Sequence, residues 1–129
     1  GNLEESIYNF NLSLNLMPKN AGVLYNLGVI NRSLNNLEKA KEYFFKTLEV
    51  NPNFIDSYIN IAQIYEREKK IFDAESHYKK AFSIKKDHTS LNRAYARFLI
   101  NIGELKKGLS LMYKNYGNIR FGKSNVEIN

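Results

Sequence analysis

Residues 21–54 read AGVLYNLGVINRSLNNLEKAKEYFFKTLEVNPNF, and residues 55–88 read IDSYINIAQIYEREKKIFDAESHYKKAFSIKKDH. The second stretch follows the pattern of the first without a gap when Ala21 is aligned with Ile55. A fixed period of about 20 to 50 residues is typical of repeat architectures, in which each unit packs on its neighbours. These stretches therefore predict two successive structural repeats. Identical residues recur as the pairs Asn26/Asn60, Ile30/Ile64, Ala40/Ala74 and Lys46/Lys80.

Each repeat has the pattern of two helices. In residues 21–54, apolar and small side chains fall at helical spacing in one run that contains Leu24 and Gly28 and in a second that contains Ala40 and Phe44. The small residues matter because two antiparallel helices pack closely only where one makes room for the bulk of the other. Extending this pattern along the chain predicts helices over residues 2–17, 21–34, 37–50, 54–68, 71–85, 89–101 and 105–116.

Residues 1–20 fit only the second half of the pattern. When the same alignment is continued toward the start of the chain, Phe10, Leu14 and Pro18 coincide with Phe44, Leu48 and Pro52. We therefore expect residues 1–20 to be the second helix of a truncated repeat, and the chain to be part of a larger protein. Because this helix lacks its own partner helix, its apolar face allows a homo-oligomer to form through the exposed first helix.

The order of residue types resembles the tetratricopeptide repeat (TPR) family. The resemblance implies an all-α fold, a right-handed TPR superhelix (α-solenoid) of about three and a half helix-turn-helix repeats. The matching residues are Leu24, Leu27, Gly28, Ala40, Phe44 and Pro52 in the first repeat, and Tyr58, Ile61, Ala62, Tyr65, Ala74, Tyr78 and Ala81 in the second. The implied divisions are the truncated repeat at 1–20, TPRs at 21–54 and 55–88, a degenerate TPR or capping helix pair at 89–120, and a tail at 121–129.

The resemblance also implies a function, because the first helices of such repeats line a concave groove that binds a partner protein or an extended peptide. The groove positions implied for this chain are Tyr25, Asn26, Val29, Ile59, Asn60, Gln63, Arg93 and Arg97. Arg93 and Arg97 lie one helical turn apart and are expected to attract an acidic portion of the ligand, because two guanidinium groups can hold a carboxylate.

Asn26 and Asn60 occupy the same position of successive repeats. A carboxamide offers both donors and an acceptor, so two of them can pair with the backbone of an extended peptide. This arrangement is similar to the asparagine ladder in the TPR superhelix of O-linked GlcNAc transferase, although Ala94 interrupts it in the last repeat. The alternative is that both asparagines form hydrogen bonds within their own helix pairs.

The charge is concentrated at one end of the chain. The whole chain carries +6, and all of this excess arises from residues 85–129. Basic residues interleaved with aromatic ones, such as Lys114 beside Tyr113, make nucleic-acid binding by the basic C-terminal third an alternative function. The sequence nevertheless favours a protein partner, because most of these aromatic residues fall at the spacing of a helix core.

No arrangement of residues indicates catalysis. The chain has no cysteine and only two histidines, His77 and His88, for which we expect surface positions. We find no metal-ligand spacing, phosphate-binding loop or nucleophile motif, and therefore predict a protein that is not an enzyme and binds no metal or cofactor. No apolar run is long enough to cross a membrane, so we expect no membrane partner and a cytoplasmic location. A further alternative is a homo-oligomerisation or spacer scaffold for a catalytic domain outside this chain.

Overall fold

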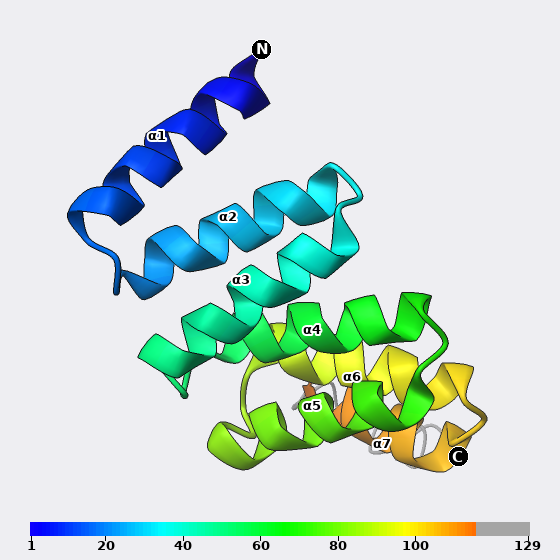
Figure 1. Cartoon of the computed structure of the whole chain (residues 1–129). Helices are drawn as coiled ribbons and strands as arrows, with labels where there is room; N and C mark the ends of the chain where they lie inside the picture. Colours follow the sequence, from blue (N-terminus) through cyan, green and yellow to red (C-terminus); the bar gives the residue numbers. More distant parts are fainter. Residues whose placement is uncertain (116–129) are drawn as a thin grey trace, which may run out of the picture. The chain divides into compact units, whose positions relative to one another are not determined.

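The computed structural model describes residues 1–115, and all regular secondary structure in this part of the chain is α-helical (Figure 1). The helix ranges predicted from the sequence are confirmed to within one residue, apart from the predicted end at residue 116, which lies outside the described residues. The helices are α1 (Asn2–Leu16), α2 (Ala21–Ser33), α3 (Leu37–Val50), α4 (Ile55–Arg67), α5 (Ile71–Ile84), α6 (Thr89–Asn101) and α7 (Leu105–Asn115).

The chain divides into two compact units. The first unit is Gly1–Ile84 and contains α1 to α5, and the second begins at Lys85 and contains α6 and α7. In the first unit, α2 packs on α3 and α4 packs on α5 as two hairpins, while α3 contacts α4 and α1 contacts α2. In the second unit, α6 packs on α7 as a third hairpin.

The turn inside each hairpin has the same backbone geometry. Asn35, Lys69 and Gly103 have positive φ values of 63°, 63° and 92°, and they occupy equivalent positions of the three hairpins. In each turn the next backbone N–H donates across the turn to the carbonyl five residues earlier, at N–O distances of 2.8, 2.9 and 2.8 Å. This geometry satisfies carbonyl groups at the end of the first helix. The third hairpin therefore keeps the register of the repeat, although its side chains match the sequence pattern only loosely.

The core of the first unit lies between its hairpins. Ala40, Phe44, Ile61 and Ile64 are fully buried and form one cluster. Gly28 makes room for the Phe44 ring, because a Cβ atom placed on Gly28 would lie 2.5 Å from Cε1 of Phe44. The small residue that the sequence pattern requires at this position is thus explained by a direct ring contact. Tyr25, Val29, Leu37, Leu48 and Tyr65 pack around the cluster and are partly buried.

Candidate peptide-binding face

The first helices of the two hairpins in the first unit, α2 and α4, are joined by hydrogen bonds between their side chains. The Asn60 amide nitrogen on α4 donates to the Tyr25 hydroxyl on α2, with an N–O distance of 3.1 Å, and the Asn60 oxygen accepts a hydrogen bond from Arg32. Near the ends of the two helices, Arg67 donates to the Asn35 side chain at 3.1 Å. We call the surface carried by α2 and α4, which these bonds join, the α2–α4 face.

The two asparagines at the ladder position differ in their surroundings. Asn60 is 8% exposed, and its amide nitrogen also donates to the Asp56 backbone carbonyl at 2.8 Å. Both N–H groups of Asn60 are therefore engaged within the protein. Asn26 is exposed, and its side chain forms no hydrogen bond with the rest of residues 1–115. Of the two, only Asn26 presents a complete set of donors and an acceptor to solvent.

The other predicted binding residues on this face differ in how exposed they are to solvent. Val29 and Gln63 are half-buried, and Ile59 is almost fully buried at 7% exposure. Ile59 therefore contributes to the floor of the face, whereas Val29, Gln63 and Asn26 keep accessible atoms. A bound segment can gain both apolar contact and hydrogen bonds on such a surface.

The Tyr25 side chain is held by contacts at its ring and by a hydrogen bond at its hydroxyl group. Its ring packs on Phe44 and Phe54, with centroid distances of 5.6 and 4.9 Å, and its hydroxyl accepts the hydrogen bond from Asn60. Burial, with help from the nearby Asp56 carboxylate, raises the pKa of the Tyr25 hydroxyl above its ordinary value. The hydroxyl therefore stays protonated at neutral pH and keeps its own proton as a donor.

Arg93 and Arg97 belong to the second unit. Both are exposed on α6, four residues apart, so that both side chains leave the same side of that helix. Ala94 between them is buried, at 5% exposure. Within the second unit, these two cations form a basic pair suited to a carboxylate or a similar anion.

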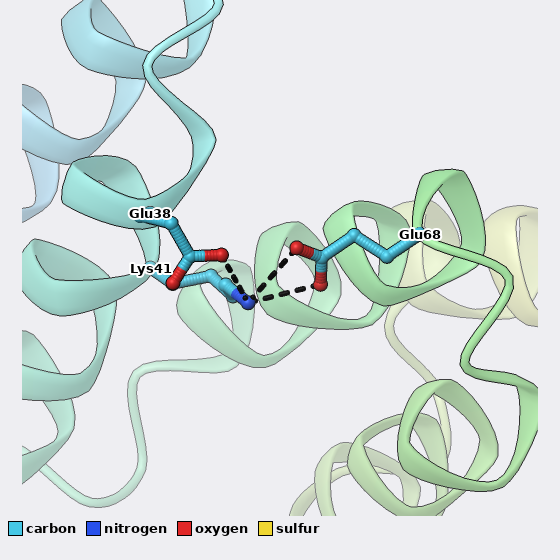
Figure 2. A network of polar contacts seen from close by, with 3 residues as sticks. All are labelled: Glu38, Lys41 and Glu68. Atoms are coloured by element: carbon cyan, nitrogen blue, oxygen red, sulfur yellow. Dashed lines mark hydrogen bonds and ion pairs between the residues drawn. The ribbon is translucent and has the colours of Figure 1, made fainter.

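A polar network that the sequence reasoning missed lies between α3 and the end of α4 (Figure 2). The Lys41 Nζ atom lies 2.9 and 3.1 Å from the two Glu68 carboxylate oxygens and 3.0 Å from Glu38. It also lies 4.9 Å from the centroid of the Tyr65 ring. Burial lowers the pKa of Lys41, but the hydrogen bonds with Glu68 and Glu38 outweigh burial, so the net pKa is raised and the ammonium stays charged.

The sequence gives little indication of this network. Glu38 and Lys41 are visible as an i,i+3 pair, but Glu68 is 27 residues away from Lys41. A surface pocket of about 580 Å³ lies beside the network and is lined by Glu38, Lys39, Lys41, Glu42, Phe45 and Tyr65. Its carboxylates are already paired with Lys41 and Lys46, so we assign the network to stability rather than to ligand binding.

The expected surface position of His77 is wrong. Its side chain is 9% exposed and lies among the rings of Phe45, Tyr58 and Tyr65. Its Nδ1 atom lies 2.8 Å from the Asp73 carbonyl oxygen, to which it donates. Three aromatic neighbours from α3 and α4 cover this residue of α5, and no pattern within α5 alone indicates that cover. His88 is half-buried and accepts a hydrogen bond from the Leu91 N–H at the start of α6.

Residues 1–115 contain neither a metal-holding cluster nor a membrane-spanning helix. This part of the chain holds no group of three or more His, Asp or Glu side chains arranged to hold a metal ion. None of its helices combines the length and the apolar character needed to span a bilayer.

Comparison with known proteins places the chain in a family. Models of the tetratricopeptide repeat match residues 21–54 and residues 55–88, which together make up more than half of the chain. The chain belongs to the tetratricopeptide repeat family, and the resemblance inferred from the sequence is confirmed. Repeats of this family form protein–protein interaction modules, and no catalytic family is indicated.

Two relatives found by sequence share one name. The chain is 34% identical over 83 residues to "Uncharacterized protein ycf37" of Pyropia yezoensis, a match that covers 62% of this chain and 47% of that protein. It is 37% identical over 79 residues to the protein of the same name in Porphyra purpurea, covering 58% of this chain and 46% of that one. The matches thus span about half the length of these curated relatives.

Solved structures support the same fold. The crystal structure of MamA superposes with a TM-score of 0.77 at 18% identity, covering 90% of this chain and 68% of MamA. The crystal structure of the yeast Tom70 superposes with a TM-score of 0.72 at 28% identity, covering 81% of this chain and 22% of Tom70. Because so few residues are identical, the likeness to MamA is evidence for the fold alone.

Proposed function

We propose that the chain binds an extended segment of a partner protein along the α2–α4 face. The observation that carries this proposal is the pair of hydrogen bonds by which Asn60 donates to Tyr25 and accepts from Arg32, because they join the first helices of two successive hairpins into one continuous surface. A surface that is ordered before binding loses less conformational entropy when a ligand docks, so its contacts contribute more to affinity.

The two asparagines act differently in this proposal. Asn26 pairs with the backbone of the bound segment, because its amide is exposed and has no competing partner within residues 1–115. Asn60 positions Tyr25 and Arg32 and so shapes the face from below. Tyr25, Val29, Ile59 and Gln63 supply side-chain contacts, and Tyr25 can donate its hydroxyl proton to a carbonyl of the ligand.

Arg93 and Arg97 provide a separate attraction for acidic groups of the partner. Both guanidinium groups are exposed on one side of α6. Exposed charges of this kind raise the rate of association more than they raise the final affinity, and salt weakens their effect.

The test is binding of a diverse peptide array to the wild type and to Asn26→Ala, with helix content checked by circular dichroism. Asn53→Ala is the matched control, because it makes the same substitution at an exposed asparagine in the turn between α3 and α4. We expect Asn26→Ala to weaken binding about tenfold for peptides of unrelated sequence, since it removes about two hydrogen bonds to the peptide backbone.

The companion variants separate the remaining roles. Asn60→Ala should weaken binding together with a loss of stability, because it removes three internal hydrogen bonds. Arg93→Gln/Arg97→Gln should slow the binding of acidic peptides only, and mostly at low salt. If Asn26→Ala and Asn53→Ala bind every peptide as the wild type does, the α2–α4 face is not the binding surface.

A further inference from the structure

A surface pocket of about 860 Å³ lies in the first unit, where the turn between α1 and α2 lies near the end of α3 (Figure 1). Among its lining residues, Leu24 of α2 is 3% exposed and Val50 of α3 is 38% exposed. Leu24 therefore lies deep in the pocket and Val50 near its opening. None of the residues proposed to bind a segment on the α2–α4 face contributes to it. The lining residues are Leu14, Asn15, Pro18, Lys19, Leu24, Lys46, Glu49 and Val50.

The next repeat contains the same site one period further along the chain, but there it is filled. The residue that replaces Leu24 is Tyr58. Its hydroxyl donates to the Pro52 carbonyl oxygen at an O–O distance of 2.9 Å, and its ring centroid lies 6.5 Å from that of His77. The protein's own tyrosine thus occupies the equivalent site in the second repeat. Four other lining residues recur there as the same or a similar residue, in the pairs Leu14/Leu48, Pro18/Pro52, Lys46/Lys80 and Val50/Ile84.

The first repeat keeps the site but lacks the ring. A leucine side chain is shorter than a tyrosine side chain and has no hydroxyl group, so Leu24 cannot donate to the Pro18 carbonyl. Pro18 lines the pocket, and its carbonyl accepts no hydrogen bond from the rest of residues 1–115. The two features that hold Tyr58, apolar space and a carbonyl acceptor, are therefore both present in the first repeat.

The pocket is formed by α1, α2 and α3, whatever precedes them. The corresponding elements around Tyr58 are α3, α4 and α5, and the helix that precedes these is α2. Within residues 1–115, the hydrogen bond of the Tyr58 side chain goes to the turn after α3 and its ring contact is with α5, so neither involves α2. A helix before α1 in the same register would therefore leave the pocket open.

The charges around the pocket favour an anion beside the inserted group. Two lining residues, Lys19 and Lys46, are basic, and one, Glu49, is acidic. Lys46 pairs with Glu42 at 3.0 Å, whereas Lys19 is exposed and forms no ion pair with the rest of residues 1–115. An acidic group that lies next to the opening can therefore pair with Lys19.

We propose that this pocket binds a tyrosine side chain of a partner protein, and that an acidic residue flanks this tyrosine. The ring takes the place that Tyr58 takes in the next repeat, the hydroxyl donates to the Pro18 carbonyl, and the acidic neighbour pairs with Lys19. Tyrosine suits such a site because it combines a large apolar area with one polar group, which also makes it a frequent anchor at protein interfaces. The contact is independent of the proposed binding on the α2–α4 face.

The test is a titration of the isotope-labelled whole chain with a blocked peptide of sequence Gly-Asp-Tyr-Asp-Gly, followed by NMR. The backbone N–H signals of Lys19 and Val50 should shift, with a dissociation constant on the order of 1 mM because one anchor buries little area. The same peptide with phenylalanine in place of tyrosine should bind about fivefold more weakly, since it lacks the hydroxyl donor. The peptide with alanine at this position should not shift these signals.

Two variants close the pocket. Leu24→Tyr fills it with a ring of the chain itself, as in the second repeat, and should weaken binding at least tenfold. Val50→Glu places a carboxylate at the opening and should have a similar effect through repulsion of the acidic peptide. Val50 is partly exposed, so this variant keeps the test decisive if Leu24→Tyr does not fold. Circular dichroism shows whether each variant keeps its helices.

The charge contribution is tested with Lys19→Glu, which should weaken binding about fivefold at low salt and less at high salt. Lys39→Glu is the matched control, because it makes the same charge change at an exposed lysine outside this pocket. Asn26→Ala should leave this titration unchanged, so the result is separate from that for the α2–α4 face.

Three outcomes would overturn the proposal. The first is that the wild type shows no shifts around the pocket up to about 5 mM peptide. The second is that the folded closing variants bind as the wild type does. The third is that the shifts are confined to α6, which would assign the acidic peptide to Arg93 and Arg97 instead.

Discussion

The two hairpins of the first unit, α2–α3 and α4–α5, follow one sequence pattern but solve the same packing problem in different ways. In the first hairpin, Gly28 leaves space that the Phe44 ring fills. In the second, Ala62 and Tyr78 occupy the equivalent positions, and both are fully buried. The repeat therefore places a small residue opposite an aromatic ring in both hairpins. The rings differ in one respect, because Tyr78 carries a hydroxyl group that needs a hydrogen-bond partner and Phe44 does not.

The identity of the ring also affects which hydrogen bond a neighbouring repeat position forms. The Tyr78 hydroxyl donates to the Glu66 carboxylate at 2.5 Å, which closes a polar contact inside the second hairpin. The residue equivalent to Glu66 in the first hairpin is Arg32, and Phe44 has no hydroxyl to pair with it. Arg32 instead donates to Asn60 in the next hairpin. The same repeat position thus forms a hydrogen bond within its own hairpin when the ring is Tyr, and a hydrogen bond to the next hairpin when the ring is Phe.

Removing the rings themselves should cause the greatest loss of stability. Phe44→Ala and Tyr78→Ala should each lower the free energy of unfolding by about 3–5 kcal/mol, because both side chains are fully buried and leave a cavity. Urea unfolding measures the change. Phe45→Ala is the control, since its ring is 37% exposed and its loss should cost only about 1 kcal/mol. Equal costs for Phe44 and Phe45 would show that the core lies elsewhere.

The next effect compares Lys41 with Glu75, the residue at the same position of the second hairpin. Lys41→Met should cost about 2–3 kcal/mol, because the buried ammonium pairs with Glu68 on another helix. Glu75→Gln should cost no more than about 0.5 kcal/mol, because Glu75 pairs with the exposed Lys79 one turn away on the same helix. The same unfolding measurement applies, and similar costs for the two variants would contradict the assignment of the Lys41 network to stability.

A smaller effect tests the polar half of the comparison. Tyr78→Phe gives the second hairpin the ring of the first and removes the hydrogen bond to Glu66, for a cost of about 1–2 kcal/mol. Changing Glu66→Gln as well should add little, because both changes remove the same contact. A double-mutant cycle on these two residues measures the coupling, and additive costs would mean that the contact is not formed in solution.

Substitutions at the positive-φ residues of the hairpin turns should change stability by an amount similar to that of Tyr78→Phe. Lys69→Gly should stabilise the first unit by about 1 kcal/mol, because Lys69 has a positive φ of 63° that side chains disfavour. Gly103→Ala should destabilise the third hairpin by about 1 kcal/mol, since its φ is 92°. Thermal unfolding of both variants should shift in opposite directions, and shifts of the same sign would argue against these turn conformations.

The weakest effect is a dependence of stability on pH. Burial lowers the pKa of His77 from its ordinary value of 6.5, with Lys80 adding to the effect and the Asp73 carbonyl opposing it. The unfolded chain therefore binds this proton more readily, so stability is fully present above pH 6.5 and is lost as the pH falls through the lowered pKa. His77→Gln, which does not titrate, should show a flatter dependence, and an identical pH profile would remove His77 as the cause.

Local sequence was sufficient for the helices and for the family. The regular repetition of small and bulky residues predicted helix ranges that the structure confirms to within one residue over residues 1–115. It also led to the tetratricopeptide repeat family, which the family models confirm. These features depend on spacing along the chain, because a helix places residues three and four apart on one side. The peptide-binding role of the individual groove residues stays a prediction.

Which side chains meet was settled by the packing of the helices in three dimensions. The sequence placed Asn26 and Asn60 at equivalent positions, yet the structure exposes Asn26 and engages both N–H groups of Asn60. It likewise brought Lys41 to Glu68 and covered His77 with aromatic rings from other helices. Repetition determines where a residue lies on its own helix, but burial and hydrogen bonding depend on the neighbouring helices, whose residues differ from one repeat to the next.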